Sequence, residues 1–149
     1  MNKYIRFVPL VLLLSYVLFK AAPYIQNKTP GDPEHEPTAS QKEMLADVKA
    51  IISSHPEAAK DFTNLYYGIA LVVGSDEVVL NTTDEVRRVH ENAGAIAIQA
   101  GEIPRIPGYA DAVNKYLSQE IGTDNVPLDL NTKKKIIDAF KGLAWATSQ

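Results

Sequence analysis

The residues best suited to recognising a ligand or doing chemistry gather in one loop, GEIPRIPG, between two segments of helical periodicity. Residues 101–108 hold one acid, Glu102, and one base, Arg105, among apolar residues that a plain connector does not need. The two prolines and two glycines of the loop restrict its shape. Such a loop could recognise a partner or carry a catalytic glutamic acid. The alternative is a structural crossover in which Ile103 and Ile106 plug a helical bundle.

A histidine stands on the apolar face of the helix predicted before this loop. His90 lies four residues after Val86 and three before Ala93. A buried histidine can act near neutral pH as a base, a switch or a metal ligand. No second histidine stands three to five positions away, so the spacing of a helical metal site is missing. We favour a hydrogen-bonded histidine at the core edge.

The predicted binding surface combines the loop, the histidine and two tyrosines. Its members are Glu102, Arg105, Tyr109, Tyr67 and His90. A stripe of small residues on the helix before the loop predicts close packing of a neighbouring helix more than a ligand site. The stripe consists of Ala93, Gly94, Ala97, Ala100 and Gly101.

Other chemistries lack their residues in this chain. The absence of cysteine excludes disulfides, thiolate zinc sites, iron–sulfur clusters and cysteine nucleophiles. The sequence has no glycine-rich phosphate loop, nucleophile elbow, H-E-x-x-H motif or calcium loop. We therefore predict no cofactor and no metal. The net charge of −3 argues against a dedicated nucleic-acid binder.

The net charge conceals a division of the chain. Residues 1–28 sum to +4 without an acid, whereas residues 29–149 sum to −7. The basic part contains the apolar run Phe7–Phe19. Counted over residues 4–25, the segment is 22 residues long, or about 33 Å as a helix, and would span a hydrocarbon core of about 30 Å.

The same run also has the length of a signal-peptide core. Cleavage requires small residues before the cut, but a cut after Ala22 would leave Lys20 at one of these positions. We therefore predict an uncleaved signal-anchor helix over residues 1–25, with cleavage and secretion as the second choice. One short N-terminal apolar run is typical of export. We expect the following domain on the non-cytoplasmic side, which in a bacterial cell is the periplasm or envelope.

A proline-rich linker and an all-α domain are predicted after the anchor. Residues 26–40, QNKTPGDPEHEPTAS, are almost free of apolar side chains, which predicts a disordered stalk. Residues 41–149 contain five amphipathic segments. Capping boxes at Ser40–Glu43 and Thr82–Glu85 predict two of the helix starts.

The remaining helix limits follow from prolines, glycines and an aspartate. Pro56 begins the second helix, Gly101 and Gly122 end the third and fourth, and Asp129 begins the last. The β-branched runs within residues 69–80 leave a hairpin open as an alternative. The side chains expected to face the core are Met44, Leu45, Val48, Ile51, Ile52, Ala58, Ala59, Phe62, Leu65, Tyr66, Ile69, Val72, Val73, Val86, Val89, Ala93, Ile96, Ala97, Tyr109, Val113, Tyr116, Leu117, Ile121, Ile136, Ile137, Phe140, Leu143 and Ala144.

This organisation predicts a single-pass membrane protein that displays a small helical binding or scaffolding domain. We expect it to be non-catalytic and to bind an unidentified protein partner, with a homo-oligomer as an open alternative. Another alternative is a structural component of a virion or membrane complex.

An enzymatic alternative comes from two acids. Glu102 and Asp111 have eight residues between them. The anchor, α-rich domain and length resemble those of membrane-tethered phage endolysins, whose motif has a glutamate and an aspartate at this spacing, followed by a threonine. Leu117 stands where that threonine belongs. The resemblance implies an envelope glycan hydrolase, of muramidase type, with Glu102 as its acid.

Overall fold

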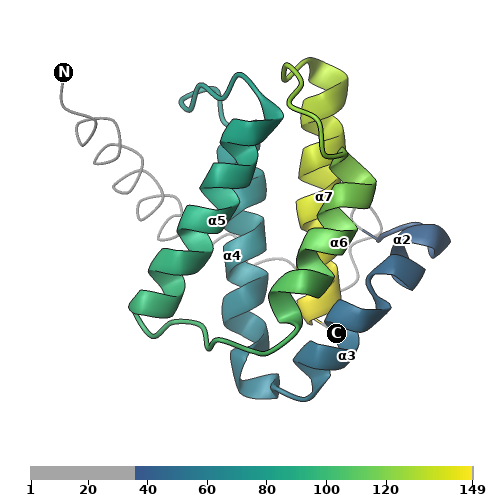
Figure 1. Ribbon diagram of the computed structural model, residues 1–149, viewed down its shortest axis with the longest axis vertical. Coiled ribbons are helices and arrows are strands. Elements are labelled where there is room, and N and C mark those ends of the chain that lie inside the picture. The colour runs from purple at the N-terminus through teal and green to yellow at the C-terminus, as the bar shows by residue number, and fades with distance from the viewer. Residues whose placement is uncertain (1–35, 149) are drawn as a thin grey trace.

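The computed structural model describes residues 36–148, and the regular elements of this part of the chain are all α-helices. The predicted anchor over residues 1–25 and most of the linker lie outside the described residues. The helices are α2 (Ala39–Met44), α3 (Ala46–Ser53), α4 (Pro56–Gly74), α5 (Thr83–Gln99), α6 (Tyr109–Ile121) and α7 (Leu130–Ser148) (Figure 1). The prediction of an all-α bundle is confirmed. None of the described helices combines the length and the hydropathy that a membrane span requires.

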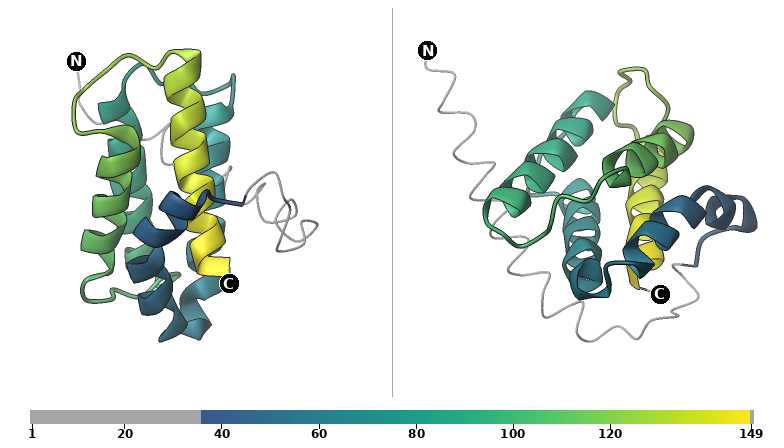
Figure 2. Two further views of the ribbon diagram at one scale, coloured as in Figure 1. Left: turned by 90° about the vertical axis from the view of Figure 1, so that its right-hand side faces the viewer. Right: turned by 60° about the horizontal axis from the view of Figure 1, so that its bottom comes forward.

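The four long helices alternate in direction and form two layers (Figures 1 and 2). One layer consists of α4 and α7, which share the most extensive contact of any helix pair in the described chain. The other layer consists of α5, which packs on α4, and α6, which packs on α7 and α3. Because α5 and α6 barely approach each other, a seam runs between them.

The start of the bundle differs from the prediction. The predicted first helix is two short helices, which meet at the fully buried Leu45. The capping box at Ser40 is wrong, because Thr38 is the N-cap: its Oγ1 accepts from the Gln41 N–H at 3.2 Å, and Gln41 Oε1 accepts from the Thr38 N–H at 2.9 Å. The sequence contains two overlapping boxes, and the helix begins at the earlier one.

The central helix excludes the hairpin considered for residues 69–80. α4 is helical up to Gly74, and a loop follows. Ten residues of α4 are buried, which agrees with a helix that is apolar on several sides and packs against three others.

The other helix limits follow the local signals in the sequence. Pro56 is the first residue of α4. Thr82 Oγ1 accepts from the Glu85 N–H at 3.4 Å, whereas the Glu85 carboxylate accepts from the Asn81 N–H at 2.6 Å, one residue earlier than in a capping box. Asp129 caps α7 by accepting from a backbone N–H. All side chains predicted to face the core are buried or half-buried.

Candidate functional site

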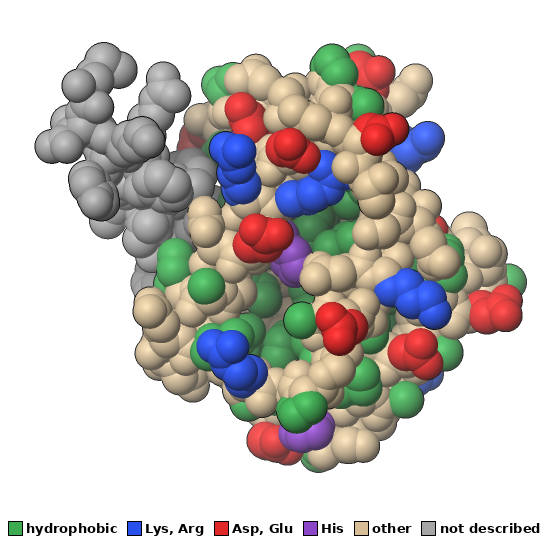
Figure 3. Space-filling view, in the orientation of Figure 1, with side chains coloured by type: hydrophobic (Ala, Val, Ile, Leu, Met, Phe, Trp, Pro, Cys, Tyr) green, Lys and Arg blue, Asp and Glu red, His purple; other side chains and the backbone are tan. Residues whose placement is uncertain are grey.

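The seam between α5 and α6 is a groove with two neighbouring cavities of about 340 and 290 Å³. The larger cavity lies toward the loop of residues 100–108, and the smaller lies toward the start of α5. His90, Glu91 and Asn114 line both cavities, so the two are continuous along the helices. Figure 3 shows apolar side chains in this hollow, a histidine in its wall and charged side chains around it.

The floor of the larger cavity is apolar and aromatic. It comes from α4, through Phe62, Leu65 and Tyr66, while Val113 of α6 forms part of the wall. Gly94 of α5 faces the same space, because a Cβ atom added there would meet no described atom within 4 Å. Ala93 and Ala97 of the small-residue stripe are buried, as the packing prediction has it, whereas Gly94 of the same stripe faces open space.

The loop fixes one end of the groove. Gly101 adopts a φ of +73°, which favours glycine, and its N–H donates to the Ile98 carbonyl at 3.1 Å. The Glu102 N–H donates to the Ala97 carbonyl at 2.9 Å, which completes a Schellman motif. Beyond this turn Ile103 and Ile106 are buried, as the crossover interpretation predicts.

A polar cluster fixes the other end. The buried Thr83 donates through Oγ1 to the Asp124 carbonyl at 2.9 Å and accepts from the Val126 N–H at 3.0 Å. Arg87 donates to the carbonyls of Gly122 and Asp124 at 2.7 and 3.2 Å. These bonds hold the start of α5 to the loop between α6 and α7. Between this polar cluster and the loop of residues 100–108, the seam between α5 and α6 stays open.

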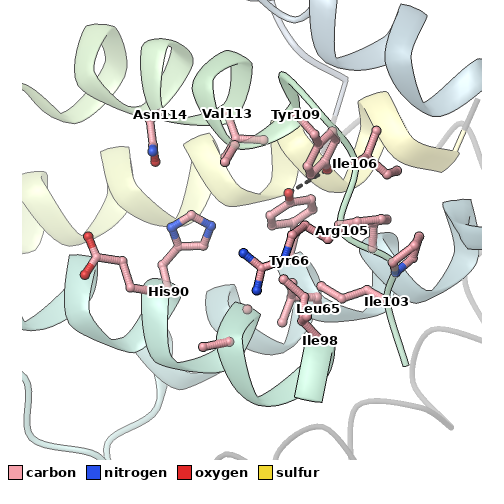
Figure 4. A pocket seen from close by; sticks show the side chains of 16 residues that line it. Leu65, Tyr66, His90, Ile98, Ile103, Arg105, Ile106, Tyr109, Val113 and Asn114 are labelled. Atoms are coloured by element: carbon pink, nitrogen blue, oxygen red, sulfur yellow. Dashed lines mark hydrogen bonds between the residues drawn. The ribbon is translucent and has the colours of Figure 1, made fainter. Parts of the chain in front are cut away.

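Two buried tyrosines meet beside the larger cavity. The hydroxyls of Tyr66 and Tyr109 lie 2.6 Å apart and share a hydrogen bond (Figure 4). Burial raises the pKa of both tyrosines, so both hydroxyls are neutral at physiological pH. The pair has two hydroxyl hydrogens and uses one in this bond. Neither hydroxyl has another hydrogen-bond partner among residues 36–148, so one hydroxyl hydrogen of this buried, cavity-lining pair is left without an acceptor.

His90 lines both cavities at the place where they meet. Its half-buried ring lies 6.3 Å from the Tyr66 ring and 5.6 Å from the Phe140 ring, measured between centroids. Burial lowers the pKa of His90 to about 4, so the ring is neutral at pH 7. The hydrogen bond predicted for this histidine is not found within the described chain.

Arg105 is the cation of the larger cavity. It is exposed, and Figure 4 shows its side chain over the cavity, next to Tyr66 and across from His90. Among the residues that the structure describes, its side chain has no ion pair and no hydrogen bond. A charged donor therefore stands unpaired beside apolar surface.

The structure brings together three of the five predicted site residues, because Arg105, Tyr109 and His90 line the larger cavity. Glu102 is exposed and Tyr67 is half-buried, and neither lines that cavity or the smaller one. The acids of the endolysin comparison are also apart. Asp111 borders a shallow depression on the other side of α6, which Glu102 does not line.

Sequence reasoning missed Tyr66, Glu91 and Asn114 as lining residues, and it did not predict the open space beside Gly94. The signal for Gly94 was its place in the small-residue stripe, whereas Tyr66 reads as an ordinary core residue. Within residues 36–148, no three histidine, aspartate or glutamate side chains cluster as a metal site would require. The chain matches no protein-family model, and it has no significant similarity to a curated protein or a solved structure.

Proposed function

We propose that this is a single-pass membrane-anchored protein whose helical domain lies on the non-cytoplasmic side and binds ligands in the groove between α5 and α6. The observation that carries the binding role is the apolar groove itself. A helical bundle normally packs its apolar faces directly against one another, but here a cavity of about 340 Å³ remains, and the buried Leu65, Tyr66 and Val113 form part of its lining. Small-molecule sites have this character, with apolar walls and a few polar groups.

Binding fits the groove better than catalysis does. His90 is its most reactive side chain, yet aromatic rings surround it and no described nucleophile or carboxylate is bonded to it. Nucleophilic catalysis depends on a nucleophile beside its base, and the described lining shows no such pair. The anchor rests on the apolar segment of residues 4–25, which is long enough to span a bilayer.

The lack of cysteine allows a direct test of topology, because one introduced cysteine is a unique label site. Gln99→Cys would place it on the exposed end of α5, and Asn2→Cys before the apolar segment. A membrane-impermeant maleimide should label the first variant in membrane-intact cells and the second only after permeabilisation. The reverse pattern, or loss of the N-terminal label from the mature chain, would contradict the proposal.

The groove is tested by filling it. Gly94→Leu adds a side chain where the structure has open space, whereas Gln99→Leu adds the same side chain on the exposed surface of α5, outside both cavities. The full chain in lipid nanodiscs is titrated with the uncharged dye N-phenyl-1-naphthylamine. The dye fluorescence above that of protein-free nanodiscs should fall in Gly94→Leu and persist in Gln99→Leu. Equal fluorescence of the wild type and Gly94→Leu would refute the binding role of the groove.

A further inference from the structure

We propose that the groove binds a single-chain amphiphile with a carboxylate head, which Arg105 and the Tyr66–Tyr109 pair hold at the loop end of the larger cavity. The inference rests on the proposed function, since it names the ligand class of the same groove.

Charge complementarity indicates an anionic head. The guanidinium of Arg105 is unpaired within the described chain and stands over an apolar cavity (Figure 4). A guanidinium offers paired donors that match a carboxylate. Glu91 lines the same cavity and would repel a second negative charge. The site therefore fits a carboxylate better than a phosphate dianion.

The tyrosine pair supplies a second donor to the same head. Tyr66 and Tyr109 line the cavity beside Arg105, and one hydroxyl hydrogen is left over from their mutual bond. A carboxylate is an acceptor with two oxygens. It could accept from Arg105 with one oxygen and from the tyrosine pair with the other. The two donors lie at the same end of the groove, so they define where the head binds.

The shape of the groove indicates a linear tail. From Arg105 the groove continues past Gly94 and His90 into the smaller cavity, whose lining includes Val86 and Phe140. The stretch of α5 from Val86 to Ile98 is about 18 Å long at about 1.5 Å per residue. An acyl chain could follow this path and leave its head at Arg105.

The width of the groove's occupant also distinguishes the two kinds of ligand. An α-helix with its side chains is about 10 Å across, whereas an extended chain of methylene groups needs a narrower channel. We therefore assign the groove to a carboxylate amphiphile, and a helical partner is one of the outcomes that the test below separates.

The test uses the full chain in lipid nanodiscs and two photoreactive probes, hexadecanoic acid with a diazirine in its chain and the matching hexadecanol. Labelled peptides are identified by mass spectrometry. The acid should label α5 and α6 about tenfold more than the alcohol, since a hydrogen bond to a charged group contributes about this factor. Labelling of the proposed anchor, residues 4–25, serves as the reference for probe partitioning.

The variants separate head-group recognition from apolar binding. Arg105→Gln should lower labelling of the groove by the acid about tenfold and leave labelling by the alcohol unchanged. The control Arg88→Gln removes an exposed arginine of α5 that lines neither cavity, and should change nothing. Unlabelled decanoic acid should compete with the acid probe.

Three results would overturn the inference. Equal labelling by acid and alcohol, with no effect of Arg105→Gln, would show an apolar groove without carboxylate recognition. If a peptide with an apolar C-terminus prevents labelling and decanoic acid does not, the groove binds a protein partner. Absence of label from α5 and α6 with both probes would exclude a linear amphiphile. The dye titration with Gly94→Leu decides separately whether the groove binds at all.

Discussion

The contact between Gly142 of α7 and Tyr116 of α6 predicts that one substitution will have opposite effects in two backgrounds. A Cβ atom added at Gly142 would lie 2.5 Å from the Tyr116 hydroxyl oxygen, inside van der Waals contact. The Tyr116 ring is rigid and fully buried, so the hydroxyl cannot swing aside without disturbing the core. Gly142→Ala should therefore destabilise the wild-type domain.

The magnitude follows from two opposing terms. Overpacking of a core costs about 1–3 kcal/mol, and alanine stabilises a helix by about 1 kcal/mol relative to glycine. The expected net loss for Gly142→Ala is about 1 kcal/mol in the wild type. In the Tyr116→Phe background, the next atoms lie at 3.4 and 3.5 Å, which are ordinary contacts, so the same substitution should stabilise by about 1 kcal/mol. The coupling energy between the two sites is then about 2 kcal/mol.

Tyr116→Phe is a suitable background because the hydroxyl contributes no visible bond. It is buried and has no hydrogen-bond partner within the described residues. A buried hydroxyl left without a partner costs about 1–3 kcal/mol of stability. Removal of the Tyr116 hydroxyl should therefore not destabilise the domain. Gly94→Ala is the matched control, since an added Cβ atom there meets open space and shows the helix-propensity gain alone.

The cycle compares the wild type, the two single variants, the double variant and the control. Their thermal unfolding is monitored by circular dichroism of the full chain in nanodiscs. For a domain of this size, about 1 kcal/mol corresponds to roughly 4 °C in Tm. Gly142→Ala should lower Tm in the wild type and raise it in Tyr116→Phe. The packing argument is refuted if Gly142→Ala stabilises the wild type as much as Gly94→Ala does.

Two further predictions concern the walls of the groove. Burial lowers the pKa of His90 from 6.5 to about 4. Between these two pH values the unfolded chain therefore binds more protons at His90 than the folded chain does. The stability that neutral His90 contributes is complete above pH 6.5 and is lost as the pH falls toward 4. Between pH 7 and 5 the free energy of unfolding of the wild type should fall by about 1–2 kcal/mol more than that of His90→Leu, measured by denaturant unfolding. Equal losses in the two proteins would show that His90 does not cause the pH dependence. Thr83→Val keeps the shape of the side chain but removes its bonds to the Asp124 carbonyl and the Val126 N–H, and should cost about 1–2 kcal/mol. Hydrogen exchange at the Val126 amide should accelerate. Unchanged protection of this amide would show that Thr83 does not hold the loop between α6 and α7 to α5.

Most helix limits were predictable because their causes are local. Pro56, Gly101, Gly122 and Asp129 each act through their own backbone or through an N–H a few residues away. The start of α2 was not predictable, since two capping boxes overlap in the sequence and the choice depends on how residues 36–38 pack. Where the local sequence permits two helix caps, the sequence alone does not show which one the helix uses.

The groove could not be predicted from periodicity. The pattern placed His90 on an inward face correctly, but the same pattern describes a side chain packed in a core and one that lines an open seam. Tyr66 and Tyr67 show a second limit. One step along a helix turns the side chain by about 100°, so only Tyr66 reaches the cavity, and the sequence alone did not favour it over its neighbour.

The seam between α5 and α6 is a property of the backbone, because the bonds at its two ends do not depend on an occupant. At one end, a nine-residue connection with a Schellman turn and the buried Ile103 and Ile106 keeps the helices apart. Antiparallel helices that pack directly are usually joined by about 2–5 residues. At the other end, Thr83 and Arg87 hold α5 to the loop that follows α6. The groove is therefore preformed, and the proposed ligand would not have to open the bundle in order to bind.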